Sequence, residues 1–99
     1  MSNNATAAQR RRFDRIASLG CLPCQLDGIY GTPATVSHCH GHGHRDHSRA
    51  YPACPQHHLA TFAVPGIPNR HATPEEFKAR YGSDDELYEL TRRLLGETE

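Results

Sequence analysis

The sequence predicts a small α+β domain stapled by zinc. An N-terminal helix precedes a two-stranded hairpin and a short helix, and two further helices end the chain. Two observations lead to this fold class. A chain of 99 residues with 36% hydrophobic residues and no tryptophan buries too little apolar surface to do without a metal, a disulfide or a partner. Four cysteines accompany eight histidines, a composition typical of metal sites.

Whether the cysteines form disulfides or bind a metal depends on whether the protein is in an oxidising or a reducing compartment. Residues 1–15 are polar and basic, without the apolar run of a secretory leader. No apolar stretch is long enough to span a membrane. Because nothing points to an oxidising compartment, cysteines mixed with histidines indicate metal ligands rather than disulfides. We therefore expect a cytoplasmic protein with no membrane partner.

Local signals then give each element in order. Capping residues around apolar spacing mark helices, β-favouring runs mark strands, and glycine, proline and charge mark loops. Before the first strand we expect a flexible terminus at residues 1–5, a helix at 6–19 ended by Gly20, a tight turn at 21–24 and a loop at 25–33. The next elements are a strand at 34–39, a loop at 40–49, a brief edge strand at 50–51 and a short helix from 55 to 60 or 62.

Two capping boxes predict the C-terminal helices. A turn segment at residues 64–69 precedes a box that opens at Thr73, and the helix that follows stops at Gly82. A second box opens at Ser83 and begins the last helix, which ends at Gly96. Residues 6–99 are expected to form a single domain. Four leucines share one face of the last helix, Leu87, Leu90, Leu94 and Leu95. The first three are expected in the core.

Two ligand pairs with the same spacing predict a structural zinc site. In Cys21-x2-Cys24 and in Cys54-x2-His57, one turn of chain can aim both side chains at a tetrahedral ion. The pairs flank the predicted strands, so zinc would clip the loop to the short helix. The alternative is two unrelated surface turns with free thiols, which the small core disfavours. Cys39 has no such partner and is expected to pack half-buried.

Two further histidines point to hydrolytic chemistry. His38, on the first strand, is suited to take a proton from water, and His58, on the short helix, to hold a divalent ion against a phosphate. Consecutive helical residues point roughly 100° apart, so His57 can serve the zinc while His58 faces a catalytic groove. The arrangement is typical of a one-metal nuclease. The alternative is that both histidines support a zinc module or face solvent.

The remaining histidines carry weaker signals. His40 and His47 are favoured as further metal ligands or phosphate contacts, whereas His42 and His44 are better explained as solvated loop residues. His71 either folds back over the metal site or lies in a turn without a functional role, and the sequence favours neither alternative.

Net charge does not decide whether the partner is a nucleic acid, because 11 Lys+Arg balance 11 Asp+Glu. The basic residues gather near the start and include Arg10, Arg11, Arg12 and Arg15. This helix start either contacts phosphates or is a solvated face, and the two interpretations weigh the same. The candidate DNA contacts are Arg10, Arg11, Arg12 and Arg49.

With these residues in place, the chain resembles the Ref family of phage-type recombination-enhancement proteins, which are RecA-dependent HNH endonucleases. The resemblance runs from Arg10 to Leu95 and rests on the order and spacing of several motifs. They are an arginine-rich helix leading to Cys21-x2-Cys24, a strand ending in His38, His47 seven residues before Cys54, the stretch Pro52-Ala53-Cys54-x2-His57-His58 similar to the family's PLCxxHH pattern, His71, Phe77-x3-Tyr81-Gly82 and a leucine helix.

The resemblance implies an HNH (ββα-metal) fold and endonuclease action on DNA held in a RecA filament or displacement loop. It also implies a bacterial host cell and a phage or prophage origin. His38 falls at the general-base position and His58 at the catalytic-metal position, with His47 as a further catalytic candidate. Mg²⁺ or Mn²⁺ is expected at the catalytic site, with Zn²⁺ as an alternative. The structural zinc falls to Cys21, Cys24, Cys54 and His57.

Three positions depart from the family pattern. Ser37 stands where many HNH domains have a metal-binding His or Asp before the base, and Arg49 stands where the middle Asn is expected. Ala53 replaces the usual leucine. The second ligand of the catalytic metal is therefore open among His40, Asp46, His47 and His71. The alternative function is a non-catalytic zinc-stapled module that binds nucleic acid or protein, and nothing in these residues explains RecA dependence.

Overall fold

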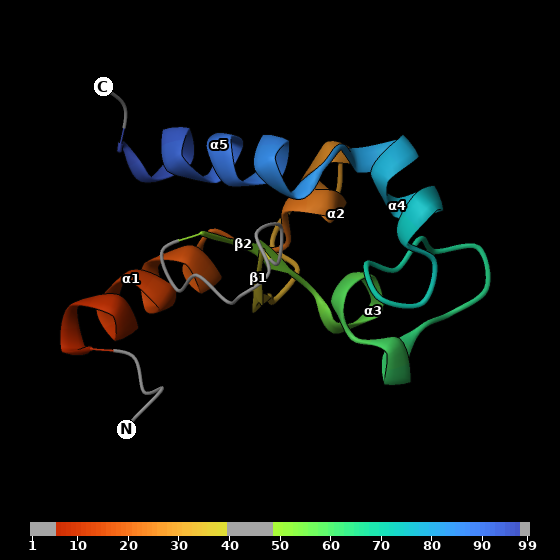
Figure 1. The fold of residues 1–99 in the computed structure, drawn as a ribbon, viewed down its shortest axis with the longest axis horizontal. Coiled ribbons are helices and arrows are strands. Elements are labelled where there is room, and N and C mark those ends of the chain that lie inside the picture. The colour runs from red at the N-terminus through yellow and green to blue at the C-terminus, as the bar shows by residue number, and fades with distance from the viewer. Residues whose placement is uncertain (1–5, 40–48, 98–99) are drawn as a thin grey trace.

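The computed structural model describes residues 6–39 and 49–97. In chain order the elements are α1 (Ala7–Ser18), α2 (Leu22–Leu26), β1 (Thr35–His38), β2 (Ala50–Ala53), α3 (Pro55–His58), the 3₁₀ helix η1 (Ala60–Phe62), α4 (Pro74–Tyr81) and α5 (Asp84–Leu95). The hairpin lies in the middle, with α1 to one side, α5 running above it, and α3 and α4 at the far end (Figure 1). The predicted α+β class and order of elements are confirmed. The predicted terminus at 1–5 and most of the predicted loop lie outside the described residues.

The two strands form an antiparallel pair with Thr35 opposite Ala53 and His38 opposite Ala50. β2 is four residues long and wholly buried. The strand is brief, as predicted, but it runs through Pro52 to Ala53 instead of ending at Tyr51. The amide of Cys39 donates to the carbonyl of Arg49. Because hydrogen-bonded pairs alternate along an antiparallel ladder, Pro52 falls at a non-bonded position, where its missing N–H removes no ladder bond.

The zinc-motif segments are more helical than predicted. α2 replaces the start of the expected loop because the Cys21 sulfur accepts the amide of Cys24 at 3.4 Å and caps the helix. Cysteine is not among the usual N-cap residues, which are Ser, Thr, Asp and Asn. α3 ends at His58, earlier than predicted, because Leu59 is extended with φ −100° and ψ 126°. The chain then forms the separate turn η1.

The C-terminal helices confirm one capping box and contradict the other. Ser83 caps α5 with Glu86 as predicted, and Gly96 ends the helix in the left-handed conformation with φ 80°. Thr73 makes no side-chain cap on α4. Its hydroxyl instead accepts the amide of Asn69 at 2.8 Å and contacts the Asn69 carbonyl at 3.3 Å, so the predicted first box does not form.

The core lies between the hairpin and the helices α2, α4 and α5. Its largest members are Tyr51, Tyr81, Phe77, Leu22 and Leu87, and Cys39 belongs to it as well. Leu90 packs against this cluster, but Leu94 is 47% exposed, so its prediction as a core residue was wrong. Leu94 lies nearly two turns beyond Leu87, past the end of the small core. No helix of the described residues is long and apolar enough to cross a membrane.

α1 is fastened to the end of α5 by polar contacts. Its N-terminus is closed by a capping box between Thr6 and Gln9 that the sequence analysis did not foresee. Arg12 binds the carboxylate of Glu97 through two nitrogens at 3.0 and 2.9 Å, and Arg15 donates to the Leu95 carbonyl at 2.8 Å. The basic start and the acidic end of the chain therefore meet.

Candidate functional site

The two predicted ligand pairs come together in one buried cluster. The ligand atoms of Cys21, Cys24, Cys54 and His57 all lie within 4.8 Å of one another. The Cys24 and Cys54 sulfurs are 4.0 Å apart. Two sulfurs each about 2.3 Å from a tetrahedral zinc would be about 3.8 Å apart, so the spacing fits an ion of that size. This Cys3His cluster can hold a metal such as zinc.

The local fold explains how each ligand is aimed. Cys21 and Cys54 are the N-cap residues of α2 and α3, so the two helices begin at the cluster. Cys24 and His57 follow three residues later, one turn along each helix. The hairpin lies between the two halves in sequence, and a bound metal would therefore tie α2 to α3 across it.

The His57 ring is oriented by a backbone carbonyl. Its Nδ1 lies 2.9 Å from the Pro68 oxygen, and because a carbonyl only accepts, Nδ1 must carry the proton. The other nitrogen, Nε2, then offers its lone pair to the cluster, which is the usual arrangement of a histidine ligand. Tyr81 packs edge-on against the ring at 5.1 Å between centroids.

The electrostatics of the cluster favour a cation. Burial raises the pKa of the Cys21 thiol and outweighs the backbone hydrogen bonds from Cys24 and Cys54, which lower it. The buried Cys21 thiol therefore favours its neutral form unless a positive charge offsets the cost of desolvating the thiolate. A coordinated metal ion supplies that charge, so the chemistry of the donor set fits a metal.

Tyr81, from the Phe77-x3-Tyr81 motif, is itself held in place. Its hydroxyl donates to Asp27 at 2.7 Å, and Arg80 donates to the same carboxylate. Burial raises the pKa of Asp27, but the hydrogen bonds from Tyr81 and Arg80 outweigh it and lower the pKa overall. The motif thus links α4 to the loop after α2 and sets the ring that packs on His57.

Asn69 is a residue that the sequence analysis missed. It is fully buried, and its side-chain amide donates to the carbonyls of Gln56 and Leu59 at 2.9 Å each. Its oxygen accepts the amides of His71 and Ala72 at 2.9 and 2.8 Å. One side chain therefore joins α3 to the segment that carries His71. No spacing or periodicity marks it, since it stands in a stretch that reads as a plain turn.

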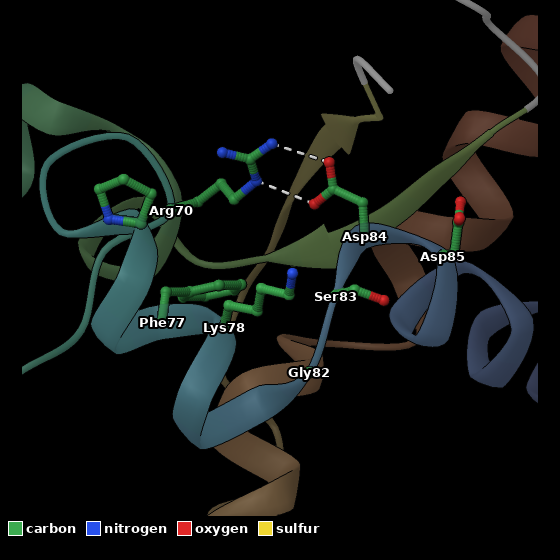
Figure 2. Close-up of a pocket in the computed structure, with 8 residues that line it drawn as sticks. Arg70, Phe77, Lys78, Gly82, Ser83, Asp84 and Asp85 are labelled. Carbon is green, nitrogen blue, oxygen red and sulfur yellow. Dashed lines mark hydrogen bonds and ion pairs between the residues drawn. The ribbon is translucent and has the colours of Figure 1, made fainter. Parts of the chain in front are cut away.

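Arg70 was also missed. Its amide donates to the His57 carbonyl at 2.6 Å, and its guanidinium holds both oxygens of Asp84 at 2.8 and 2.7 Å. The hydrogen bond to Asp84 is the main reason that the pKa of Arg70 is raised. Figure 2 shows this pair together with Phe77 and Lys78. These four residues help to line a hollow of about 270 Å³. The contact anchors the start of α5 to the metal cluster.

His58 lies beside His71, one of the candidates for the second ligand of the catalytic metal. The two ring centroids are 5.5 Å apart, and the Nδ1 of His58 lies 2.7 Å from the hydroxyl of Thr35. The structure therefore brings two of the predicted second-site residues together. His40 and His47 lie outside the described residues.

His38 has a different neighbour from His58. Its ring meets Phe13 of α1 edge-on, with centroids 5.2 Å apart. The residue is half-buried, and its Nε2 atom is wholly covered. Ser37, at the position where many HNH domains place a ligand, is only 1% exposed.

The four predicted DNA-contacting arginines divide into two groups. Arg10 and Arg11 are exposed on α1 and line a shallow hollow on that helix. Arg12 is paired with Glu97. Arg49 is paired with Asp85, and its guanidinium lies 4.7 Å from the centre of the Tyr88 ring.

The family of the chain follows from a comparison of its sequence with family models. Residues 5–96 match the family described as recombination enhancement, RecA-dependent nuclease. The chain therefore belongs to this family of RecA-dependent nucleases, which agrees with the resemblance stated above. No curated protein matches the chain.

Proposed function

We propose that the chain is an HNH-type DNA endonuclease, which hydrolyses phosphodiester bonds with a histidine base and one catalytic divalent metal. The observation that carries this proposal is the family match over residues 5–96, which names a nuclease. The order of hairpin and short helix supports the HNH type, because α3 places His57 in the metal cluster and His58 directly beside it. Residues 6–99 would act as one domain.

The Cys3His cluster is proposed to hold structural zinc. Four nitrogen and sulfur ligands, all buried, complete a tetrahedral shell and leave no position for substrate. The zinc would fix α3 relative to the hairpin and so fix the place of His58. Catalysis is assigned to His38 and His58 rather than to this ion.

His38 is proposed as the general base, with Nδ1 as the reacting atom. Because Nε2 is covered, we assign the contact with the attacking water to Nδ1. The neutral ring would keep its proton on Nε2 and accept one from the attacking water on Nδ1. A positioned base of this kind contributes about 10²–10⁴-fold to a rate.

His58 is proposed as a ligand of the catalytic metal, and His71 as a second ligand. Their rings lie close enough for both to face one ion. Mg²⁺ or Mn²⁺ is the proposed ion, with Zn²⁺ as the alternative, and when bound it would stabilise charge on the scissile phosphate and the leaving oxygen. Asp46, His40 and His47, which lie outside the described residues, stay candidates for further ligands or catalytic groups.

The proposed substrate is DNA held by a RecA filament, as the family description suggests. Arg10 and Arg11 are the favoured phosphate contacts, because they are exposed on one helix. Arg12 and Arg49 already face carboxylates, so they are expected to add less to binding. A protein with few phosphate contacts needs its partner to hold the DNA.

The test is a cleavage assay on plasmid and single-stranded DNA, with and without a RecA filament, in Mg²⁺ or Mn²⁺. We expect His38→Ala to lower the cutting rate by about 10²–10⁴-fold while zinc content and melting temperature stay near wild type. His44→Ala, which removes a histidine assigned to solvent, is the matched control and should cut normally. Full activity in His38→Ala would overturn the mechanism.

One observation favours the alternative, a zinc-stapled module that only binds. Ser37 is buried against the core and Arg49 is engaged with Asp85, so neither departure from the family pattern restores a catalytic group. Folded, zinc-loaded protein that cuts no DNA under any of these conditions would establish the binding module instead.

A further inference from the structure

The Thr35 hydroxyl stands between two groups that the proposed function treats separately. Its oxygen lies 2.7 Å from the carbonyl oxygen of Ala53 and 2.7 Å from Nδ1 of His58. Ala53 is the partner of Thr35 across the hairpin and comes directly before the ligand Cys54. His58 is the proposed catalytic-metal ligand.

The direction of these two hydrogen bonds follows from the number of protons. A hydroxyl carries one hydrogen, and a backbone carbonyl can only accept. Two oxygens at 2.7 Å need a hydrogen between them, so the Thr35 proton points to Ala53. The Thr35 oxygen must then accept, and His58 must be the donor through Nδ1–H. The chain of hydrogen bonds runs from His58 as donor, through Thr35, to the Ala53 carbonyl as final acceptor.

From this we propose that Thr35 is a positioning residue that fixes the tautomer and the direction of the His58 ring. With its proton held on Nδ1, the neutral ring carries its lone pair on Nε2, which is the atom that can bind a divalent metal together with His71. The same logic operates at His57, where the Pro68 carbonyl takes the Nδ1 proton. Outer partners of this kind orient metal-binding histidines and raise their affinity.

The inference deepens the proposed function, because it rests on His58 being a metal ligand. It adds a residue that no motif of the sequence contains. Thr35 also couples the two metal sites, since its other partner is the residue before Cys54. The hydroxyl therefore aligns His58 against a part of the backbone that the Cys3His cluster fixes.

The test begins with the zinc-loaded wild-type protein and needs no variant. Long-range ¹H–¹⁵N correlation spectra report which ring nitrogen of a neutral histidine carries the proton. We expect His58 to carry it on Nδ1. A His58 ring protonated on Nε2 would overturn the inference at once.

The second step compares Thr35→Val with Thr35→Ser. Valine keeps the shape and removes the hydroxyl, while serine keeps the hydroxyl. Added Mn²⁺ should broaden the ring signals of His58 and His71 in the wild type. We expect Thr35→Val to weaken this Mn²⁺ binding by about 10- to 100-fold and to lose the Nδ1 tautomer, and Thr35→Ser to behave as the wild type.

The outcomes separate this inference from the proposed function. Wild-type tautomer and Mn²⁺ affinity in Thr35→Val would overturn the role of Thr35, even if the protein cuts DNA. Equal losses in the valine and serine variants would also overturn it, since they would indicate packing rather than the hydroxyl. A hydroxyl-dependent tautomer and Mn²⁺ affinity in a protein that does not cut would uphold the role of Thr35 and reject the nuclease mechanism.

Discussion

Replacing Asn69 by leucine should destabilise the protein strongly, although Asn69 is not a proposed ligand. The side chain is fully buried and makes four hydrogen bonds to backbone groups of Gln56, Leu59, His71 and Ala72. Leucine has a similar volume and can replace none of them. At about 1 kcal/mol for each hydrogen bond, the free energy of unfolding should fall by about 4 kcal/mol. That is a large part of the 5–15 kcal/mol typical of a domain.

Urea unfolding of the zinc-loaded protein measures this change. With an m-value of about 2 kcal/mol/M, a loss of about 4 kcal/mol would lower the midpoint by about 2 M. The control is Gln56→Ala, because only the backbone of Gln56 contacts Asn69 and its own side chain is exposed. The control should stay within about 0.5 kcal/mol of wild type. If the free energy of unfolding falls by less than about 1 kcal/mol in Asn69→Leu, the four hydrogen bonds of Asn69 do not stabilise the fold as proposed.

Two further predictions concern the metal cluster and the ends of the chain. Cys24→Ala should lose its zinc, measured by metal analysis, and should melt at a much lower temperature, because zinc binding and folding are coupled; an unchanged melting curve would reject the zinc site. Glu97→Gln should cost about 0.2–1 kcal/mol at neutral pH. The hydrogen bond from Arg12 lowers the pKa of Glu97, so the stabilisation is present above the unfolded pKa of about 4.3 and is lost as pH falls through the folded value. Wild type and Glu97→Gln should therefore converge in acid, and a difference that persists at pH 2 would contradict this origin.

The four ligands of the Cys3His cluster could be predicted from the sequence, because each ligand pair is recognised from residues that are close together in the chain. Cys21-x2-Cys24 and Cys54-x2-His57 each lie within one turn of chain, and the structure gathers all four residues. Two ligands that are three residues apart stay close to each other in any fold that keeps this turn. The proximity of His58 to His71 was not local, and the sequence left His71 undecided between the metal site and a turn.

The bracing residues were not predictable, because their partners are set by the fold. Asn69 bonds to backbone groups 10 and 13 residues earlier in the chain, and neither periodicity nor a motif records such a contact. The same residue also explains the failed capping box, since the Thr73 hydroxyl that should cap α4 contacts the Asn69 backbone. A local hydrogen bond to the backbone four residues earlier here takes the place of the cap.

The charge pattern was interpreted only in part. The arginines near the start and the acids near the end were both visible in the sequence, yet the expectation was DNA contact for Arg12. The structure pairs it with Glu97, because α1 and α5 lie close enough for their ends to meet. Basic residues near one end of a small chain and acidic residues near the other therefore indicate a contact between the two terminal helices as well as binding of phosphate groups.

The central claim is that one metal holds the fold while another supports cutting, and metal depletion tests it most directly. Mild chelation should leave one zinc per chain, with cutting of RecA-bound DNA lost until Mg²⁺ or Mn²⁺ is added back. His58→Ala should keep the zinc and the fold, yet fail to recover cutting. Cutting that persists without added ions, or a His58→Ala protein that recovers as the wild type does, would contradict the account.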